Sequence, residues 1–531
     1  MSVVGEAQRT LNVTQAIFGS WDTPDAAEHP AVHYRGTTWS YRQLIAEINR
    51  AGNALRELGI RREERIVLVA YDSPHFLAMM FGAMKIGAVP IPLNPYLPVD
   101  DYAYFLEDSR ARLLAVEPEI WRALGPRLQG GAPDVSWVMV LPGLGTPQIS
   151  PVGHPGPFVF YEDFIPRMDH SLEAAPTSPD EAAFWLYSSG STGKPKGAVH
   201  CHKDMISCNE TYGTKVLGIT RRDRLFSASK LYFAYGLGNG SYFAFANGAS
   251  VVLMPEKVEP SLVLETIEQT DPTLFFGVPT LYNAMLRVQG REYRFPSLRA
   301  CVSAGEPLPA EIFLRWKERY GVEIVDGIGS TEVLHIYISN RPGDCRPGTS
   351  GHVVPGYEVR IVDEDGRPVP QGEIGDLYVK GDSIAAFYWN QAEKTRSSMV
   401  GEWYRTGDKY YIDPDGYYCY AGRSDDMMKV GGMWVSPSEV ENALLRHEAV
   451  VEAAVVAVAD EAGLDKPVAY VVLSQGYVGD AAMEAALRSF ARDQMAHFKA
   501  PRAFHFVEEL PKTATGKIQR FKLRAGLAQS R

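Results

Sequence analysis

The stretch Tyr187-Ser-Ser-Gly-Ser-Thr-Gly-Lys-Pro-Lys-Gly197 decides how the rest of this chain is interpreted. The apolar run 182–187 precedes it and the apolar pair Ala198-Val199 follows it, which predicts a strand, a polar loop and a second strand. Glycines let a loop turn its N–H groups inward, hydroxyls donate to phosphate oxygens, and lysines neutralise charge. The loop therefore predicts a phosphate site. It is not a P-loop, because no Ser or Thr follows Lys194, and a Gly/Ser-rich surface turn would explain only part of it.

The length and composition are typical of a globular protein with several domains. A chain of 531 residues predicts about two to four domains. The hydrophobic content of 45% and the charged content of 22% are ordinary for such proteins. A net charge of −11 and a pI of about 5.6 argue against nucleic acid as a partner.

The N-terminus and the cysteines favour a cytoplasmic location without a membrane partner. The segment 1–8 lacks a signal-peptide core, and no apolar run reaches the roughly 18 residues of a membrane span. We interpret His200 and His202 as structural residues rather than metal ligands. We expect reduced thiols and no structural zinc, because no Cys-x-x-Cys pair occurs among the five cysteines Cys201, Cys208, Cys301, Cys345 and Cys419.

Strand and helix patterns alternate over the first four-fifths of the chain. Residues 65–70 and 89–93 read as strands around a helix that Ser73 caps and that runs to about Gly87. Residues 300–303 and 323–326 likewise flank a helix over 309–320. Repeated units of this kind predict sheets covered by helices, with binding loops at the strand ends. The Gly- and Pro-rich region 130–156 is predicted to be irregular.

A domain boundary is predicted near Gly422-Arg-Ser-Asp-Asp426. Before it, residues 401–421 suggest short strands and turns. After it come a helix at 437–447, strands at 451–459 and 468–474, and an acidic helix, enough for a small α+β domain. We therefore predict an α/β protein with a large N-terminal domain, 1–424, and a small C-terminal domain, 425–531.

Three motifs in the N-terminal part carry polar groups at strand ends or turns. Ile328-Gly-Ser-Thr-Glu332 follows a predicted strand, and its hydroxyl and carboxylate suit Mg²⁺–phosphate chemistry; a helix-capping Thr-Glu pair is the alternative. Ser303-Ala-Gly-Glu-Pro307 follows another strand, although strand–Gly–helix connections are common. In Tyr404-Arg-Thr-Gly-Asp408, a carboxylate held in a turn can accept both hydroxyls of a ribose.

Two further motifs lie in the C-terminal part. Met428-Lys-Val-Gly-Gly-Met-Trp434 contains two glycines that allow close backbone approach by a narrow ligand; a β-turn with a solvated lysine is the alternative. Pro511-Lys-Thr-Ala-Thr-Gly-Lys-Ile-Gln-Arg520 places Lys517 in a loop rich in Thr and Gly.

Together these motifs, from Thr38-Trp-Ser-Tyr41 to Arg520, resemble the adenylate-forming superfamily of acyl-CoA synthetases, luciferases and peptide-synthetase adenylation domains. Residues 511–520 meet every fixed position of its pattern Pro-x-Thr-x-x-Gly-Lys-hydrophobic-x-Arg. The resemblance implies a mobile C-terminal domain that pivots at Asp425 between two half-reactions. Ile328 departs from the usual tyrosine, which puts aromatic stacking on adenine there in doubt.

The resemblance also implies a role for each matched residue. Lys517 would stabilise charge during adenylation, Thr331 would contact phosphate, and Glu332 would help to hold Mg²⁺. The implied ATP- and AMP-binding residues are Ser188, Ser189, Gly190, Ser191, Thr192, Gly193, Lys194, Lys196, Ala304, Gly305, Glu306, Asp326 at the adenine amino group, Gly327, Gly329, and Asp408 with Arg423 at the ribose. The residues implied to face CoA are Lys429, Gly431, Gly432 and Trp434.

Two segments within this resemblance look most like benzoate- and 4-hydroxybenzoate-CoA ligases. They are Ser229-Lys-Leu-Tyr-Phe-Ala-Tyr-Gly-Leu-Gly238 and Gly329-Ser-Thr-Glu-Val-Leu-His-Ile336. Their aromatic and apolar side chains suit a flat slot for a planar ring; the alternative is that they are ordinary core residues. The implied acid pocket consists of Phe233, Ala234, Tyr235, Gly236, Gly329, His335 and Ile336.

The implied activity is that of an ATP-dependent aryl-CoA ligase of the benzoate type. A carboxylate and ATP would give acyl-AMP and pyrophosphate, and CoA would then displace AMP. The alternatives are a ligase for 4-hydroxybenzoate or another acid, and an adenylation enzyme that loads a carrier protein. A non-catalytic binding protein would not be expected to keep both Lys517 and Glu332. A second copy of this chain and a lysine acetyltransferase acting on Lys517 are the remaining candidate partners.

Overall fold

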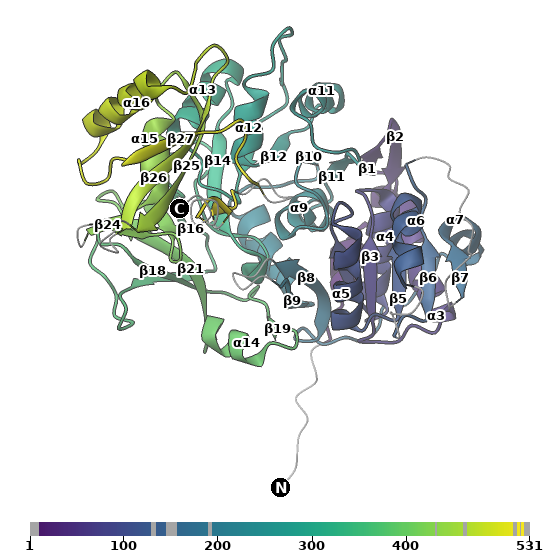
Figure 1. Ribbon diagram of the computed structural model, residues 1–531. Coiled ribbons are helices and arrows are strands. Elements are labelled where there is room, and N and C mark those ends of the chain that lie inside the picture. The colour runs from purple at the N-terminus through teal and green to yellow at the C-terminus, as the bar shows by residue number, and fades with distance from the viewer. Residues whose placement is uncertain are drawn as a thin grey trace.

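The computed structural model describes residues 10–128, 134–144, 157–188, 194–430, 433–459, 465–512, 518–520 and 522–524. It is a mixed α/β protein in which helix-covered sheets form a large N-terminal part and a smaller group of elements follows (Figure 1). The predicted fold class is therefore confirmed. None of the helices in the described ranges combines the length and the apolar character that a bilayer crossing requires.

A parallel five-stranded sheet lies near the N-terminus, in the order β4-β3-β5-β6-β7. The predicted strand–helix–strand unit is confirmed, with Ser73 Oγ accepting the Phe76 N–H at the start of α4 (Pro74–Lys85). Residues 130–156 are not irregular throughout, because the apolar run Trp137-Val-Met-Val pairs with its neighbours as a strand. The strands are β3 (Arg65–Val69), β4 (Val89–Leu93), β5 (Leu113–Val116), β6 (Trp137–Val140) and β7 (Phe158–Phe160).

A nine-stranded sheet forms the centre of the molecule, in the order β16-β15-β14-β13-β12-β10-β11-β1-β2. Helix α4 is buried along nearly its whole length and contributes Phe81 to the core, packed against Phe18 and Phe245. The strands are β1 (Pro30–Tyr34), β2 (Thr37–Ser40), β10 (Arg224–Ser227), β11 (Ser250–Leu253), β12 (Leu274–Gly277), β13 (Ala300–Ser303), β14 (Ile324–Gly329), β15 (Ile336–Ser339) and β16 (His352–Val353).

The central strands β10 to β14 are parallel, so their carboxyl ends meet at one edge. Strand β14 extends to Gly329 and so includes the first two residues of the 328–332 motif, which is predicted to follow the strand. Its extension pairs antiparallel with β15. The helices that follow β11, β12 and β13 are α11 (Pro260–Thr270), α12 (Pro279–Met285) and α13 (Ala310–Tyr320).

Two smaller sheets complete the N-terminal part. Strands β8 (Ala182–Ser188) and β9 (Lys196–Cys201) are antiparallel, and β19 (Phe387–Tyr388) joins them through β9. The second sheet has the order β17-β18-β21-β20, with β22 paired to β21. The short strands predicted over 401–421 are instead a long hairpin of β21 (Trp403–Ile412) and β22 (Tyr418–Arg423), joined to β17 (Glu358–Val362), β18 (Gly375–Lys380) and β20 (Met399–Val400).

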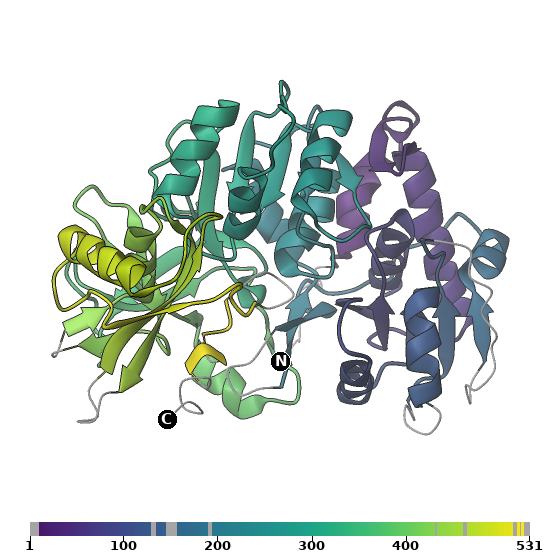
Figure 2. The ribbon, with the colours of Figure 1, turned by 45° about the horizontal axis from the view of Figure 1, so that its top comes forward.

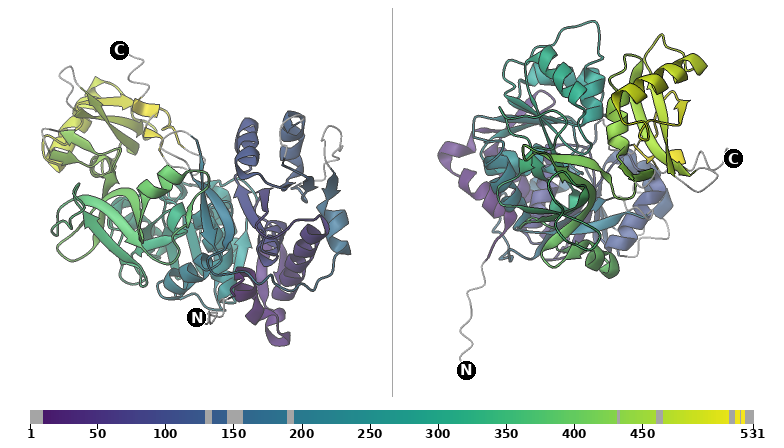
Figure 3. Two further views of the ribbon diagram at one scale, coloured as in Figure 1. Left: turned by 90° about the horizontal axis from the view of Figure 1, so that it is seen from below. Right: turned by 90° about the vertical axis from the view of Figure 1, so that its left-hand side faces the viewer.

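The C-terminal elements gather at the opposite end of the molecule from β3–β7 (Figures 1 and 2). Figure 3 shows the same separation from below. A three-stranded sheet in the order β25-β26-β27 packs against α15, which contacts α16. The elements are β23 (Met428–Val430), β24 (Met433–Val435), α15 (Pro437–Leu444), β25 (Val450–Ala459), β26 (Asp465–Leu473), α16 (Ala481–Gln494) and β27 (Ala503–Phe506).

Candidate active site

Glu332 is a buried carboxylate at the centre of the candidate site. It lies in the short helical turn η6 (Thr331–Val333) and is 5% exposed. Its Oε1 atom accepts from Lys196 Nζ at 2.8 Å, the Tyr388 hydroxyl at 2.9 Å and Ser188 Oγ at 3.2 Å. Burial raises the pKa of Glu332, but the Lys196 ammonium and these donors outweigh burial and lower it to about 2. The carboxylate is therefore ionised at any working pH.

Strand pairing explains why these three partners meet at Glu332. Ser188 and Lys196 are opposite each other in the β8–β9 pair, so the ends of the predicted phosphate loop arrive side by side. The β19–β9 pair then brings in Tyr388, whose ring centroid lies 4.1 Å from Lys196 Nζ. Lys194 is not part of this group, since its ammonium lies 5.5 Å from the ring centroid of Tyr104 on α5 (Val99–Ser109).

Asp408 and Arg423 face each other across the β21–β22 hairpin. They are register partners, and Arg423 Nη1 donates to Asp408 Oδ1 at 2.9 Å. Gly407 precedes Asp408 with φ +74°, a conformation that glycine adopts without the cost of a side chain. The predicted pairing of Asp408 with Arg423 is therefore present, and it places the carboxylate beside a guanidinium.

Asp326 lies on β14 next to Ser303 on β13, so the strand ends that carry the two motifs meet. The carboxyl is 7% exposed, and burial raises its pKa to about 8. Its Oδ1 atom has no hydrogen-bond partner among the described residues. A buried, unpaired acceptor of this kind suits a ligand that brings an N–H donor. Near it lie the other residues predicted at these strand ends, Ala304, Gly305, Glu306, Gly327 and Gly329.

Aromatic side chains from two segments meet beside this edge. The ring centroids of Tyr235 and His335 are 5.4 Å apart, and the Tyr235 hydroxyl donates to the Val302 carbonyl at 3.1 Å. A Cβ added at Gly329 would lie 2.6 Å from the His335 carbonyl oxygen, so glycine permits this approach. Burial lowers the pKa of His335 to about 3, and the ring is neutral at working pH.

The remaining acid-pocket residues adjoin these rings. Phe233 is the N-cap residue of the short helix α9 (Ala234–Leu237), which contains Ala234 and Gly236. Gly236 is required by space, since a Cβ there would lie 2.0 Å from the Lys230 carbonyl oxygen. Ile336 is the register partner of Gly329. The structure thus brings the two predicted segments together.

Other predicted residues lie elsewhere. Asp425 is exposed in the turn between β22 and β23. The backbones of Lys429 and Trp434 pair between β23 and β24, whereas their side chains fall outside the described part of the molecule. The predicted residues that lie wholly outside the described ranges are Ser189, Gly190, Ser191, Thr192, Gly193, Gly431, Gly432 and Lys517.

Sequence reasoning missed two contacts. Tyr388 gave no signal, because only the β19–β9 pairing places its hydroxyl on Glu332. The sequence indicates only a structural role for His200, but its Nε2 lies 2.8 Å from the carbonyl oxygen of Thr331, a residue of the 328–332 motif. His202 does not take part in this contact; its Nδ1 accepts the Val13 N–H instead.

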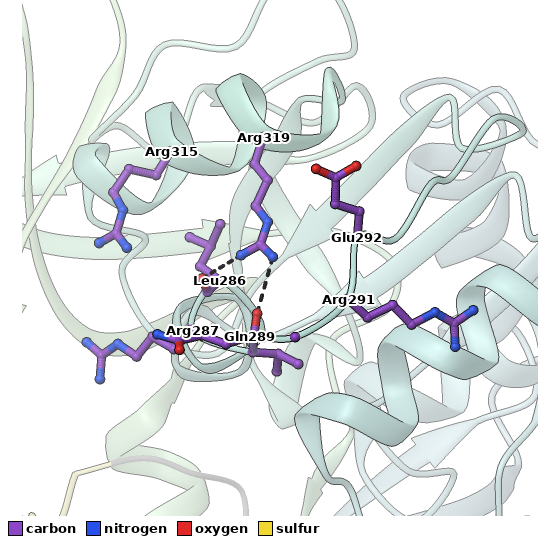
Figure 4. A pocket seen from close by; sticks show the side chains of 9 residues that line it. Leu286, Arg287, Gln289, Arg291, Glu292, Arg315 and Arg319 are labelled. Atoms are coloured by element: carbon purple, nitrogen blue, oxygen red, sulfur yellow. Dashed lines mark hydrogen bonds between the residues drawn. The ribbon is translucent and has the colours of Figure 1, made fainter.

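A surface pocket of about 600 Å³ lies apart from the candidate site (Figure 4). It is formed by the segment 286–292, which follows α12, and by α13, and four of its side chains are arginines. Arg319 donates to the carbonyls of Leu286 and Val288, which closes the C-terminal end of α12. None of the residues predicted to carry chemistry lines this pocket, whose lining is Leu286, Arg287, Val288, Gln289, Gly290, Arg291, Glu292, Arg315 and Arg319.

Known proteins resemble this chain over nearly its whole length. A benzoate–CoA ligase of Thauera aromatica is 48% identical over 494 residues, covering 92% of this chain and 91% of the relative. A 4-hydroxybenzoate–CoA/benzoate–CoA ligase of Rhodopseudomonas palustris is 42% identical over 91% of this chain and 88% of the relative.

Among solved structures, a benzoate CoA ligase from Burkholderia xenovorans superposes with a TM-score of 0.88 at 42% identity, covering 97% of this chain and 99% of that one. An anthranilate CoA ligase in complex with anthranoyl-AMP gives a TM-score of 0.92, also at 42% identity, with 98% of both chains covered. Residues 21–389 match the model of the AMP-binding enzyme family, and residues 439–517 match that of the AMP-binding enzyme C-terminal domain. The chain therefore belongs to the AMP-binding enzyme family.

Proposed function

We propose that this protein is an ATP-dependent aryl-CoA ligase that acts on benzoate or a close ring analogue. The observation that carries the proposal is the placement of Glu332. The ionised carboxylate lies at the two ends of the predicted phosphate loop, held by Ser188 and Lys196. His335, three residues after Glu332, packs its ring beside that of Tyr235. Similarity to benzoate- and hydroxybenzoate-CoA ligases supports the choice of acid.

The reaction joins a carboxylate to a thiol in two steps. The acid carboxylate attacks the α-phosphorus of ATP, and pyrophosphate leaves with the electrons of the broken P–O bond. The CoA thiol then attacks the acyl carbon, loses its proton, and AMP leaves. No covalent enzyme intermediate is required, so the protein contributes positioning and charge neutralisation.

Glu332 is suited to a Mg²⁺ ion shared with the nucleotide phosphates. Mg²⁺ prefers hard oxygen ligands and is commonly bound by one or two carboxylates together with phosphate. Glu332 is buried and ionised, as such a ligand must be. When bound, the ion would neutralise charge on the phosphates. Lys196 and Thr331 would contact phosphate oxygens, and Lys517 would reach the reacting carboxylate and phosphate.

The nucleoside contacts follow from the two other polar positions. Asp408, oriented by Arg423, would accept the ribose hydroxyls. The unpaired Asp326 Oδ1 would accept from the adenine amino group. Ala304, Gly305 and Glu306 would lie along the base.

The acid would bind against Tyr235 and His335. A slot with aromatic walls and a neutral histidine suits a planar, uncharged ring. Such a mainly apolar pocket rejects an added hydroxyl by about 10²-fold at most, so hydroxybenzoates are expected to be weaker substrates rather than excluded ones.

The proposal includes two domains, 1–424 and 425–531, with a pivot at Asp425. Rotation of the C-terminal domain at this turn would move Lys517 away from the reacting groups and bring the 429–434 hairpin to them, where the hairpin would face CoA. A cytoplasmic location, a homodimer, and silencing by a lysine acetyltransferase that removes the charge of Lys517 are also part of the proposal.

A panel of acids tests the proposed function. Purified enzyme would be given ATP, Mg²⁺ and benzoate, 4-hydroxybenzoate, 2-aminobenzoate, cyclohexanecarboxylate, octanoate or acetate, with kcat/KM measured by pyrophosphate release. Benzoate or a close ring analogue should give the highest value. Octanoate or acetate exceeding every ring acid tenfold would remove the aryl assignment. Supplying benzoyl-AMP with CoA or with a phosphopantetheinyl carrier protein separates a CoA ligase from a carrier-loading enzyme.

A further inference from the structure

The main chain of η6 is held by two neighbouring segments, strand β9 and residues 383–385. The Thr331 carbonyl lies 2.8 Å from His200 Nε2, and the Glu332 carbonyl accepts from the Ala385 N–H at 2.7 Å. The Val333 carbonyl accepts from Ser383 Oγ at 2.8 Å. Three consecutive carbonyls are thus each bound by a different donor. His200 is the one that acts on the residue whose hydroxyl is predicted to meet phosphate.

His200 is itself fixed from two sides. It is 0% exposed, and its Nδ1 lies 2.8 Å from Asp204 Oδ2, at the start of α8 (Asp204–Cys208). Its ring stacks on Phe184 with an interplanar angle of 15°. A carbonyl oxygen can only accept, so Nε2 must carry a proton and donate to Thr331. Asp204 also accepts the Cys201 N–H at 3.0 Å, which orients the carboxyl toward the histidine.

Strand β9 therefore holds the 328–332 motif at two points. Residues 196 and 200 are four apart on the strand and point to the same face. Lys196 binds the Glu332 side chain, while His200 binds the Thr331 main chain. A carboxylate fixed by its side chain alone could still shift with its backbone, and the second contact prevents this.

The backbone beyond η6 makes such support necessary. Leu334 has φ +71° and ψ −38°, in a region that residues with a side chain rarely occupy. Conformations of this kind persist only where the surroundings hold them in place. The donors on Thr331, Glu332 and Val333 supply that restraint immediately before Leu334.

We propose that His200, oriented by Asp204, is a positioning residue for acid adenylation, because it fixes the Thr331 hydroxyl and the Glu332 carboxylate through the Thr331 carbonyl. This inference rests on the proposed function, which gives Thr331 and Glu332 their tasks. His200 would touch neither ATP nor the acid. It would act on the first half-reaction, in which the phosphates are rearranged, more than on the second.

Two amide variants separate this role from plain packing. In His200→Gln the amide nitrogen can occupy the place of Nε2 and still donate to Thr331. In His200→Asn the shorter side chain reaches Asp204 but not Thr331. H202L is the matched control, because His202 is equally buried and contacts Val13 instead of η6.

Both half-reactions would be measured for each variant, together with its melting temperature. Adenylation would be followed as ATP–pyrophosphate exchange with whichever acid wild type activates, and thioester formation from supplied acyl-AMP. H200N should lose about 10- to 100-fold in adenylation kcat, since misplacing a positioned group by about 1 Å can cost about 10²-fold in rate. Its KM for the acid and its rate from acyl-AMP should stay within about threefold. H200Q should recover most of the loss, and H202L should lower only the melting temperature.

Equal adenylation rates in H200N and H200Q would overturn the proposal, as would an equal loss in both half-reactions. Unfolding of both amide variants while H202L folds would assign His200 to the core and overturn it too. If wild type activates no acid at all, the proposed function fails by itself. The positioning role of His200 is then tested by calorimetric titration with Mg·ATP. H200N should bind Mg·ATP more weakly than H200Q, and equal affinities would refute the role.

Discussion

Arg287 donates from Nη2 to the backbone carbonyl of Val451 at 3.0 Å, and so ties the turn after helix α12 to the first strand of the C-terminal sheet. Asn283, one turn earlier on α12, reaches the same carbonyl at 3.4 Å. Figure 4 shows Arg287 extending from the pocket on the side opposite to Arg291. Residues 283 and 287 belong to the segment matched to the AMP-binding enzyme model, and Val451 belongs to the segment matched to its C-terminal domain. This contact therefore stabilises one arrangement of the two segments.

Replacing Arg287 should change the balance between the half-reactions. Arg287→Met keeps the apolar stem and removes the guanidinium hydrogen bonds to the Val451 carbonyl and to Asn283 Oδ1. The half-reaction that uses this arrangement should slow by about two- to tenfold, the effect of one ordinary hydrogen bond of about 0.5–1.5 kcal/mol. The other should be unchanged or faster. Arg291→Met is the control, because Arg291 pairs with Glu268 instead. A parallel change in both rates would rule out a role in domain arrangement.

Lys517→Ala should separate the half-reactions more strongly. On the proposed mechanism the ammonium neutralises charge only while the carboxylate attacks ATP, so acid-dependent pyrophosphate release should fall by at least about 10²-fold. Thioester formation from supplied acyl-AMP and CoA should continue. Chemical or enzymatic acetylation of this lysine should have the same effect. Comparable losses in both steps would refute the assignment.

Asp425→Pro tests the proposed pivot. Proline fixes φ and should hold the C-terminal domain in one orientation. The variant is expected to adenylate at a nearly normal rate and to fail in thioester formation. Asp425→Ala, which keeps backbone freedom, serves as the control. A proline variant with both steps intact would remove Asp425 from the pivot.

Glu117 should make the stability of the protein depend on pH. The carboxyl is 2% exposed, and burial, with a smaller contribution from Glu119, raises its pKa to about 8 from 4.5. Between these values the unfolded state releases the proton while the folded state retains it. The free energy of unfolding should therefore fall with rising pH, by up to about 1.4 kcal/mol per unit, from about pH 4.5 to about pH 8.

Glu117→Gln removes this ionisation and keeps the oxygen that accepts the Tyr71 N–H. Denaturant unfolding at pH 5 and pH 8 should show the variant more stable than wild type at pH 8, with the difference shrinking toward pH 5. Glu364→Gln, at an exposed position, should show no such trend. A constant difference across this range would mean that Glu117 is ionised in the folded state.

The sequence could predict the contacts between motifs that lie close together along the chain. Asp408 and Arg423 are such a case, since a single hairpin brings their two motifs into register. The contacts of Tyr388 and His200 could not be predicted. They depend on the pairing of β9 with β19 and on the packing of β9 against η6, which are distant in the sequence. The strand at 137–140 was missed because turn residues around it masked a short apolar run.

The pairing of Lys196 with Glu332 means that the protein supplies its own counter-ion at this point. A phosphate that draws Lys196 must take it from a carboxylate, so nucleotide binding there is an ion exchange rather than the capture of an anion by a bare cation. An exchange of this kind creates little new charge for salt to screen. The affinity for Mg·ATP should thus vary weakly with ionic strength, and free phosphate, which brings no cation for the displaced Glu332, should compete poorly.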